Sequence, residues 1–154
     1  MNDTFFSVID AKEHCEGDIP EQLSYLDKMC VGSDGWSAGS FRSEIQKDTG
    51  HVLYILSGEK VIALLSGYHA VGEGDITSVA VHPDYRRKGL AQLLLDAFEK
   101  ALPSDTEDIF LEVRESNSAA IALYTKCGFE RLSVRKNFYS DPPENAVVMR
   151  KVMR

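Results

Sequence analysis

The chain reads VAVHPDYRRKGLA from Val79 to Ala91. The apolar run at its start is typical of a strand and stops at His82-Pro83, because proline cannot donate to a sheet ladder. Immediately after Gly89, apolar residues follow helical spacing and form one stripe: Leu90, Leu93, Leu94, Ala97, Phe98 and Ala101. The stretch therefore predicts a strand, a basic turn and an amphipathic helix that lies on a sheet.

The junction between the basic turn and this helix is a candidate anion site. A helix N-terminus exposes N–H groups without helical partners and carries a partial positive charge. Gly89 and Ala91 have little bulk to keep a phosphate away from that backbone. We interpret the junction as a pyrophosphate site, and the alternative is a solvated basic turn before an ordinary helix. The segment has neither a Walker A pattern nor a Gly-x-Gly-x-x-Gly turn.

Upstream of this stretch the chain predicts a strand over residues 4–9 and then two helices. Asp18 and Glu21 have the spacing of a capping box for a helix that runs to about Cys30. Ser37 or Ser40 can cap the second helix, which ends near residue 50.

Between the two predicted helices and Val79, the residue pattern is typical of strands. Three strands are predicted, over residues 51–56, 61–70 and 76–81. The first two form an antiparallel hairpin, and residues 72–75 make the turn before the third.

Downstream, Ile109, Leu111 and Val113 alternate with more polar residues along a strand, and Asn117 can cap a helix that Gly128 ends. Strands over 129–134 and 146–153 follow, separated by a proline-containing loop. The predicted order is β-α-α-β-β-β-α-β-α-β-β. With 154 residues and no linker or repeat, we expect one α/β domain over residues 1–154.

Charge and cysteine content narrow the function classes. The chain holds 24 acidic and 17 basic side chains, a net charge of −7, which argues against general nucleic-acid binding. Acidic groups outnumber basic ones by 13 to 5 in residues 1–75, whereas residues 76–154 are balanced. The first half thus suits a cationic partner and the second an anionic ligand.

Three cysteines without a Cys-x-x-Cys pair suggest neither a disulfide framework nor a zinc site, and no metal is expected. We expect a cytoplasmic protein, because the N-terminus lacks a signal-peptide pattern and the longest uncharged stretch, residues 61–72, is too short to cross a bilayer.

Two spaced motifs carry a family resemblance. Arg86-x-x-Gly89-x-Ala91 and the later Asn117-x-x-Ala120-x-x-Leu123-Tyr124-x-Lys126-x-Gly128-Phe129 resemble the signature segments of the GCN5-related N-acetyltransferase (GNAT) superfamily. The resemblance implies a mixed central sheet of about seven strands with helices on both faces, and acetyl-CoA as co-substrate.

A finer resemblance is to RimI-type ribosomal-protein alanine N-acetyltransferases. It lies in LEVRESN (residues 111–117), in VRKNFY (residues 134–139) and in Gly35-Trp36-Ser37. The chain departs from that family at Gly35, where proline is usual, and in the loop over residues 140–145. Both departures lie where the acceptor would bind.

The resemblance implies two catalytic residues. Glu112 matches the proton acceptor for the attacking amine, directly or through water, and Tyr124 matches the proton donor to the leaving thiolate. From the residues alone, the favoured interpretation of Glu112 is a strand carboxylate that pairs with Arg114 or Lys126. Tyr124 can be a half-buried aromatic that packs beside Ala120, one turn earlier.

The same resemblance assigns binding roles. Trp36 and Tyr139 would flank the acceptor, although Trp36 can instead pack in the core. Asn117 would contact the cofactor arm, and the alternative is that it is a helix cap and nothing more. Backbone groups of the strand end would pair with the pantetheine arm, and the turn with the helix start would hold the pyrophosphate. The implied cofactor residues are Val79, Ala80, Val81, Arg86, Arg87, Lys88, Gly89, Leu90, Ala91, Gln92 and Asn117.

Together these features predict an enzyme that moves acetyl from acetyl-CoA to the N-terminal α-amine of a protein, by resemblance a ribosomal protein. An acetyltransferase for a small amine, such as a polyamine, an aminoglycoside or an amino acid, is the alternative within the fold. A CoA-binding regulatory module without turnover is the alternative from a different functional class, and the presence of both Glu112 and Tyr124 weighs against that module.

Overall fold

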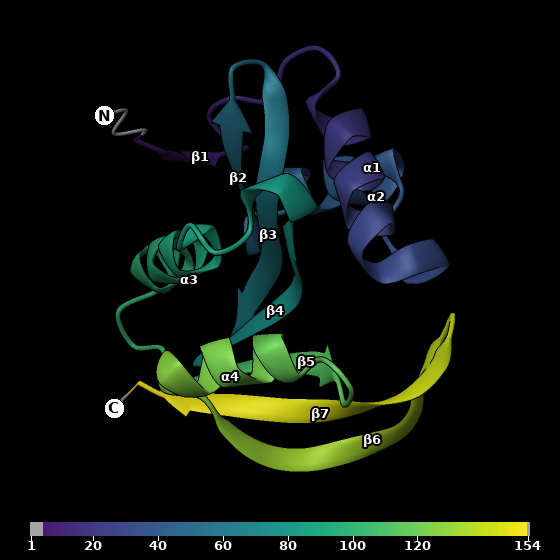
Figure 1. The fold of residues 1–154 in the computed structure, drawn as a ribbon. Coiled ribbons are helices and arrows are strands. Elements are labelled where there is room, and N and C mark those ends of the chain that lie inside the picture. Colours follow the sequence, from purple (N-terminus) through teal and green to yellow (C-terminus); the bar gives the residue numbers. More distant parts are fainter. Residues whose placement is uncertain (1–4, 154) are drawn as a thin grey trace. The chain divides into compact units, whose positions relative to one another are not determined.

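The computed structural model describes residues 5–153. The described elements are β1 (Val8–Asp10), α1 (Ile19–Val31), η1 (Gly32–Asp34), α2 (Ala38–Gln46), β2 (Gly50–Ser57), β3 (Lys60–Ala70), β4 (Glu73–Val81), η2 (Pro83–Tyr85), α3 (Leu90–Ala101), β5 (Asp108–Arg114), α4 (Ser118–Lys126), β6 (Glu130–Ser140) and β7 (Pro143–Val152). Their order is the predicted one (Figure 1). Thr4, the first residue of the predicted first strand, lies outside the described residues.

The strands form one seven-stranded sheet in the order β1-β2-β3-β4-β5-β7-β6. β1 pairs antiparallel with β2, β4 pairs parallel with β5, and β7 pairs antiparallel with both β5 and β6. A mixed sheet with helices confirms the α/β class and the strand number that the resemblance implied.

The chain divides into two compact units, one of Met1–Gly67 with Ser78–Ala101 and one of Tyr68–Thr77 with Leu102–Arg154. A single domain over the whole chain stays a prediction.

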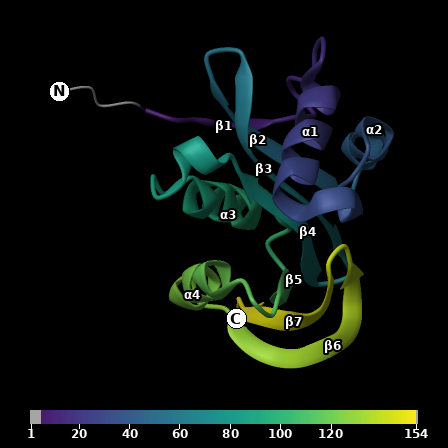
Figure 2. The same ribbon diagram turned by 45° about the vertical axis from the view of Figure 1, so that its right-hand side comes forward.

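In the first unit, α1 and α2 lie on one side of β2 and β3, and α3 lies on the other (Figures 1 and 2). Leu23 of α1 and Phe41 of α2 are fully buried against Val52 and Tyr54 of β2. Helices on both sides of these strands match the implied arrangement.

The apolar stripe of α3 is slightly rotated from its predicted position. Leu90, Leu94 and Phe98 are buried as expected, but Leu93 is 40% exposed and Leu95 is buried in its place. The row of Leu90, Leu94 and Phe98 therefore faces the sheet. The residue buried beside this row is Leu95, not Leu93.

The two N-terminal helices differ in how they are capped. Asp18 precedes α1 but makes no side-chain capping bond, and Glu21 instead pairs with Arg42 of α2. The predicted capping box is therefore wrong. Of the two candidates for α2, Ser37 is the cap, because its hydroxyl accepts the Ser40 N–H at 3.1 Å. The helix ends at Gln46, before the predicted end near residue 50.

In the second unit, β5 shows the predicted alternation. Ile109, Leu111 and Val113 are buried, and Leu111 and Val113 pair with Met149 and Val147 of β7 in the same buried face. The intervening residues, Glu112 among them, point to the opposite face of the sheet.

Helix α4 and its ends follow the prediction. It begins after Asn117, whose side-chain oxygen accepts the Ala120 N–H at 3.1 Å. It ends before Gly128, which has a positive φ of 101°.

Two predicted irregular segments are strand instead. Residues 73–75, predicted as part of a turn, begin β4, and the turn is made by Val71 and Gly72. The predicted loop over residues 135–145 is mostly a hairpin, since β6 extends to Ser140 and β7 begins at Pro143. β6 lies at the sheet edge and is exposed along nearly its whole length, so its polar sequence carries no burial pattern.

Candidate active site

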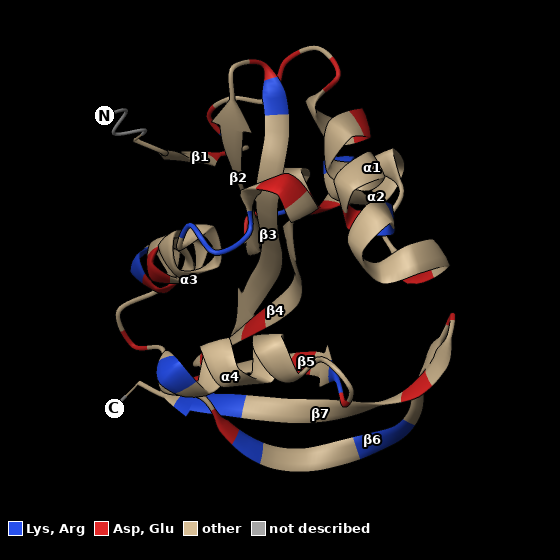
Figure 3. Cartoon of the chain, in the orientation of Figure 1, with Lys and Arg blue, Asp and Glu red and all other residues tan. Residues whose placement is uncertain are grey.

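The basic turn and the start of α3 form the first part of the candidate site. Arg87 and Gly89 have left-handed backbone conformations, with φ of 66° and 77°. A Cβ at Gly89 would meet no atom within 4 Å, so the space beside this backbone is open. The first N–H groups of α3 have no partner within the helix. Figure 3 shows the Arg and Lys residues as a blue stretch that leads into α3. This arrangement fits an anionic group such as a pyrophosphate.

Arg86 fastens this turn to the end of β4. Its Nε donates a hydrogen bond to the Val81 carbonyl at 3.1 Å, and the Cys30 Sγ lies 3.6 Å from the same oxygen. The guanidinium thus holds the backbone of the turn, and any contact with the cofactor stays a prediction.

The end of β4 is the segment predicted to pair with the pantetheine arm. Ala80 is buried in the core, whereas Val79 and Val81 are half-buried. On the side of β3, the His82 N–H pairs with the Ile62 carbonyl at 2.8 Å. The register of the parallel β4–β5 pair includes Glu73 opposite Asp108 and Ile76 opposite Leu111. Pairing of Val79–Val81 with the pantetheine arm stays a prediction.

Glu112 lies on β5 with its side chain 30% exposed. Its Oε1 accepts a hydrogen bond from Arg135 Nη1 at 2.9 Å. The expectation of a partner at Arg114 or Lys126 is wrong, because the partner is Arg135 of β6. Asp75 of β4 lies on the same face, and burial, then the Glu73 and Glu112 charges, raise the pKa of Asp75.

Tyr124 of α4 is 7% exposed. Its ring packs edge-on against Phe129, with centroids 6.0 Å apart. Burial, with a smaller effect of Tyr139, raises the pKa of Tyr124 well above its ordinary value. Tyr124 therefore packs, but it is buried rather than half-buried, and its ring contact is with Phe129. Burial keeps the proton on its phenol, as a donor needs.

The remaining predicted site residues have defined structural contacts. The Trp36 ring packs on Phe41 with centroids 5.3 Å apart, which confirms its contact with the core. Asn117 caps α4. The Tyr139 ring lies under the Arg114 guanidinium, 4.3 Å from centroid to carbon. Contacts of these three residues with acceptor or cofactor stay predictions.

Asp27 was missed by the sequence interpretation. It is 1% exposed, accepts the Trp36 N–H at 2.8 Å and is hydrogen-bonded by the Ser78 hydroxyl. It thus ties α1 to the start of α2 and to β4. A signal existed in the sequence, because Asp27 lies at i+4 from Leu23 on the apolar stripe of α1.

Within residues 5–153, no group of three or more His, Cys, Asp or Glu side chains could hold a metal ion. The helices of the same residues are all too short or too polar to cross a bilayer.

Residues 21–129 match the acetyltransferase (GNAT) family. The chain belongs to this family. The matched range includes the basic turn, Glu112 and Tyr124, and it confirms the N-acetyltransferase class predicted from the two motifs. As a GNAT acetyltransferase, the chain takes its acetyl group from acetyl-CoA.

Two curated relatives are similar to this GNAT chain. The [ribosomal protein bS18]-alanine N-acetyltransferase of Escherichia coli strain K12 is 34% identical over 117 residues, which cover 74% of this chain and 78% of the relative. An N-alpha-acetyltransferase of Saccharolobus solfataricus is 47% identical over 81 residues. That match covers 51% of this chain and spans about half, 48%, of the archaeal relative.

A solved structure agrees with the sequence relatives. The ribosomal-protein-S18-alanine N-acetyltransferase from Escherichia coli superimposes with a TM-score of 0.78 and 28% identity, covering 97% of this chain and 94% of that one. The resemblance of the GNAT chain to the RimI type is therefore confirmed.

Proposed function

We propose that this chain acetylates the N-terminal α-amine of a protein, and that its acceptor in the cell is a ribosomal protein. The observation that carries the proposal is the similarity, over 74% of the chain, to an enzyme named for the alanine of ribosomal protein bS18. The GNAT family match over residues 21–129 includes the positions of Glu112 and Tyr124.

The reaction begins with removal of a proton from the acceptor. An α-amino group has a pKa of about 7.7–8.0 and is mostly protonated at neutral pH, so attack needs a base. Glu112 is partly exposed on β5, and its Oε1 is engaged by Arg135. The carboxylate accepts the amine proton, directly or through water, while Arg135 holds its position.

The neutral amine then attacks the thioester carbonyl and forms a C–N bond, and the C–S bond breaks as the tetrahedral intermediate collapses. The leaving thiolate takes a proton. Tyr124 supplies it from a phenol that burial keeps protonated. The tetrahedral intermediate also loses one nitrogen-bound proton, which restores the Tyr124 phenol after that phenol has protonated the thiolate. The net result is an N-acetylated chain, a free thiol and one proton, which Glu112 has taken up.

Binding of both substrates draws on the segments described above. The start of α3 and the turn with Gly89 hold the pyrophosphate, Val79–Val81 pair with the pantetheine arm, and Asn117 contacts the same arm. Trp36 and Tyr139 flank the acceptor peptide. The acidic excess in residues 1–75 favours approach of a basic protein such as a ribosomal one. A cytoplasmic location stays a prediction.

A thiol-release assay with defined acceptors tests the proposal. Acetyl-CoA is supplied with peptides that carry the N-termini of ribosomal proteins, with the same peptides blocked at the α-amine, and with polyamines, aminoglycosides and free amino acids. We expect turnover with unblocked peptides and acetyl on the α-amine by fragment mass spectrometry. Turnover only with small amines would replace the proposal by the small-amine alternative. A protein that loses its N-terminal acetyl group in cells without the gene is then identified as the acceptor.

A further inference from the structure

The tip of the β6–β7 hairpin is fastened to β5 by one arginine. Nη1 of Arg114 donates to the Pro142 carbonyl at 2.8 Å, and Nη2 donates to the Asp141 carbonyl at 2.8 Å. The guanidinium also lies over the Tyr139 ring, 4.3 Å from its centroid. Arg114 thus contacts both the turn of the hairpin and the aromatic residue that we place beside the acceptor.

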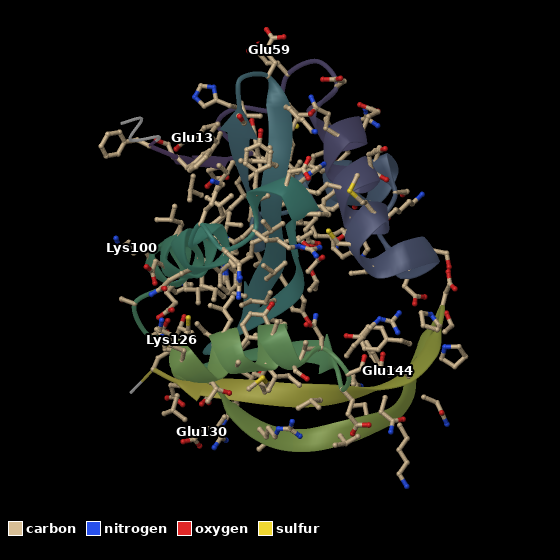
Figure 4. The ribbon with its side chains drawn as sticks, viewed as in Figure 1. Glu13, Glu59, Lys100, Lys126, Glu130 and Glu144 are labelled. Atoms are coloured by element: carbon tan, nitrogen blue, oxygen red, sulfur yellow. The ribbon has the colours of Figure 1, made fainter. Side chains whose placement is uncertain are left out.

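Glu144 lies at the start of β7 (Figure 4). It connects Arg114 to a second segment. Its Oε1 accepts from Arg114 Nη1 at 3.3 Å, and its Oε2 accepts from the Ser116 N–H at 2.5 Å. The hydrogen bonds from Ser116, and after them those from Arg114, lower the pKa of Glu144. Ser116 directly precedes Asn117, the cap of α4 and a predicted cofactor contact. One carboxylate therefore joins the hairpin to the turn between β5 and α4.

The hairpin backbone alone leaves Tyr139 weakly fixed. The β6–β7 ladder is interrupted between Arg135 and Tyr139, and Asn137 has a positive φ of 55°. Beyond the interruption only Tyr139 with Glu144 and Ser140 with Pro143 remain paired. Since a bulge bends the strand that carries it and re-aims its side chains, the contact with Arg114 contributes to the position of the Tyr139 ring, together with the edge-on contact of that ring with Phe138 at 5.0 Å.

We propose that Arg114 and Glu144 are a positioning pair, which fixes Tyr139 for the acceptor peptide and the Ser116–Asn117 turn for the cofactor arm. The inference rests on the proposed function, because it deepens the description of that same site. Neither residue touches the reacting atoms. The pair couples the acceptor side of the site to the cofactor side through a single carboxylate.

The buried side of this unit is independent of the pair. Leu111, Val113, Val147 and Met149 form the opposite, buried face of the sheet, whereas the side chains of Arg114 and Glu144 are 17% and 18% exposed. Conservative substitutions of the pair should therefore change substrate binding more than folding.

The variants Arg114→Lys and Glu144→Gln distinguish the two positioning roles, that toward Tyr139 and that toward the Ser116–Asn117 turn. Lysine keeps the charge but cannot stack on Tyr139 while it donates to two carbonyls, because it lacks the planar fork of arginine. We expect Arg114→Lys to raise the KM for the peptide about tenfold or more, with the KM for acetyl-CoA unchanged. Glutamine keeps the shape of Glu144 but weakens both charge-assisted bonds, so Glu144→Gln should raise the KM for peptide and for acetyl-CoA.

Arg131→Lys is the matched control, because Arg131 is an exposed residue of β6 outside these contacts, and we expect it to leave both KM values unchanged. Hydrogen exchange provides a readout that does not depend on turnover. Amides of residues 136–145 should exchange faster in Arg114→Lys than in the unmutated protein, while those of β5 stay protected. Unchanged KM values for the peptide in both Arg114→Lys and Glu144→Gln, at full activity, would overturn the positioning pair and leave the proposed function standing.

If the unmutated protein acetylates only small amines, the proposed function fails by itself. The KM of the same variants is then measured for the amine that is acetylated. An unchanged KM for that amine, with unchanged exchange of the hairpin, overturns the positioning pair as well, whereas a raised KM with faster exchange supports it.

Discussion

The Glu112 carboxylate and the Arg135 guanidinium meet at 2.9 Å across an intervening strand. Glu112 lies opposite Val148 of β7, and Arg135 lies opposite Ala146 of the same strand. β7 therefore separates the two strands whose side chains form the pair. The candidate proton acceptor is held by the hairpin that also carries Tyr139.

Glu112→Gln should lower turnover most at low pH. At about pH 6.5 the α-amine is mostly protonated and needs a base, whereas at about pH 9.5 it is already neutral. Acetyl-CoA binding should be nearly unchanged in the variant. The measurement is kcat/KM for the peptide at both pH values. A decrease by the same factor at both would show that Glu112 organises the site without accepting a proton.

Tyr124→Phe removes the hydroxyl and keeps the ring that packs on Phe129. General acid catalysis is worth about 10² to 10⁴ in rate, so kcat should decrease by about that factor. The free energy of unfolding should change by no more than about 1 kcal/mol, because the packing is retained. Stopped assays on the purified variant and its thermal unfolding give both quantities.

An acetyl thioester with a more acidic leaving thiol serves as the control for Tyr124→Phe. It should recover part of the lost rate in the variant and give little gain in the unmutated enzyme, since a better leaving thiolate needs less proton donation. Early melting with near-normal turnover per folded molecule would assign Tyr124 to packing alone.

Acetyl-CoA should raise the melting temperature of the unmutated protein, because it binds the folded state only. Gly89→Glu should abolish that shift, since a carboxylate would occupy the open space beside the Gly89 backbone. Gly89→Asn is the matched control. Asparagine tolerates the φ of 77° at this position better than other side chains do, and it brings no charge. A full shift in Gly89→Glu would contradict the phosphate assignment.

Asp27→Ala should destabilise the protein by about 1–3 kcal/mol, because the Trp36 N–H loses its acceptor. Asp27→Asn keeps an acceptor and should cost much less. Exposed Asp84→Asn serves as the control on the same unit. Urea unfolding at neutral pH measures the three differences, and equal losses for the alanine and asparagine variants would refute the acceptor role.

The pH dependence of Asp27→Asn has a definite sign. Burial raises the pKa of Asp27 in the folded protein above its unfolded value. The contribution of Asp27 to stability is therefore full below the unfolded pKa, about 3.9, and decreases as the pH rises through the folded pKa. The stability of Asp27→Asn relative to the unmutated protein should accordingly be higher at pH 7 than at about pH 4. A difference that does not vary between these pH values would contradict this assignment.

Local patterns in the sequence determined most elements of this protein. The row of Leu90, Leu94 and Phe98 on α3, the alternation along β5 and the Asn117 cap each depend on neighbours within a few residues. Helical spacing and strand alternation express burial on one face, so they can be recognised without the rest of the fold. The two family motifs are local in the same sense, and they identified the acetyltransferase class.

Tertiary structure alone decided the partners of the charged residues. Arg135 rather than Arg114 pairs with Glu112, because the order β5-β7-β6 brings β6 within reach across β7. Asp27 accepts a hydrogen bond from the hydroxyl of Ser78, which lies 51 positions further along the chain. Much of the β6–β7 hairpin was predicted as a loop. β6 is an exposed edge strand, and without a buried face its sequence shows no alternation of apolar and polar residues. Such pairings depend on which strands become neighbours, and strand order is set by packing of the whole sheet rather than by any short segment.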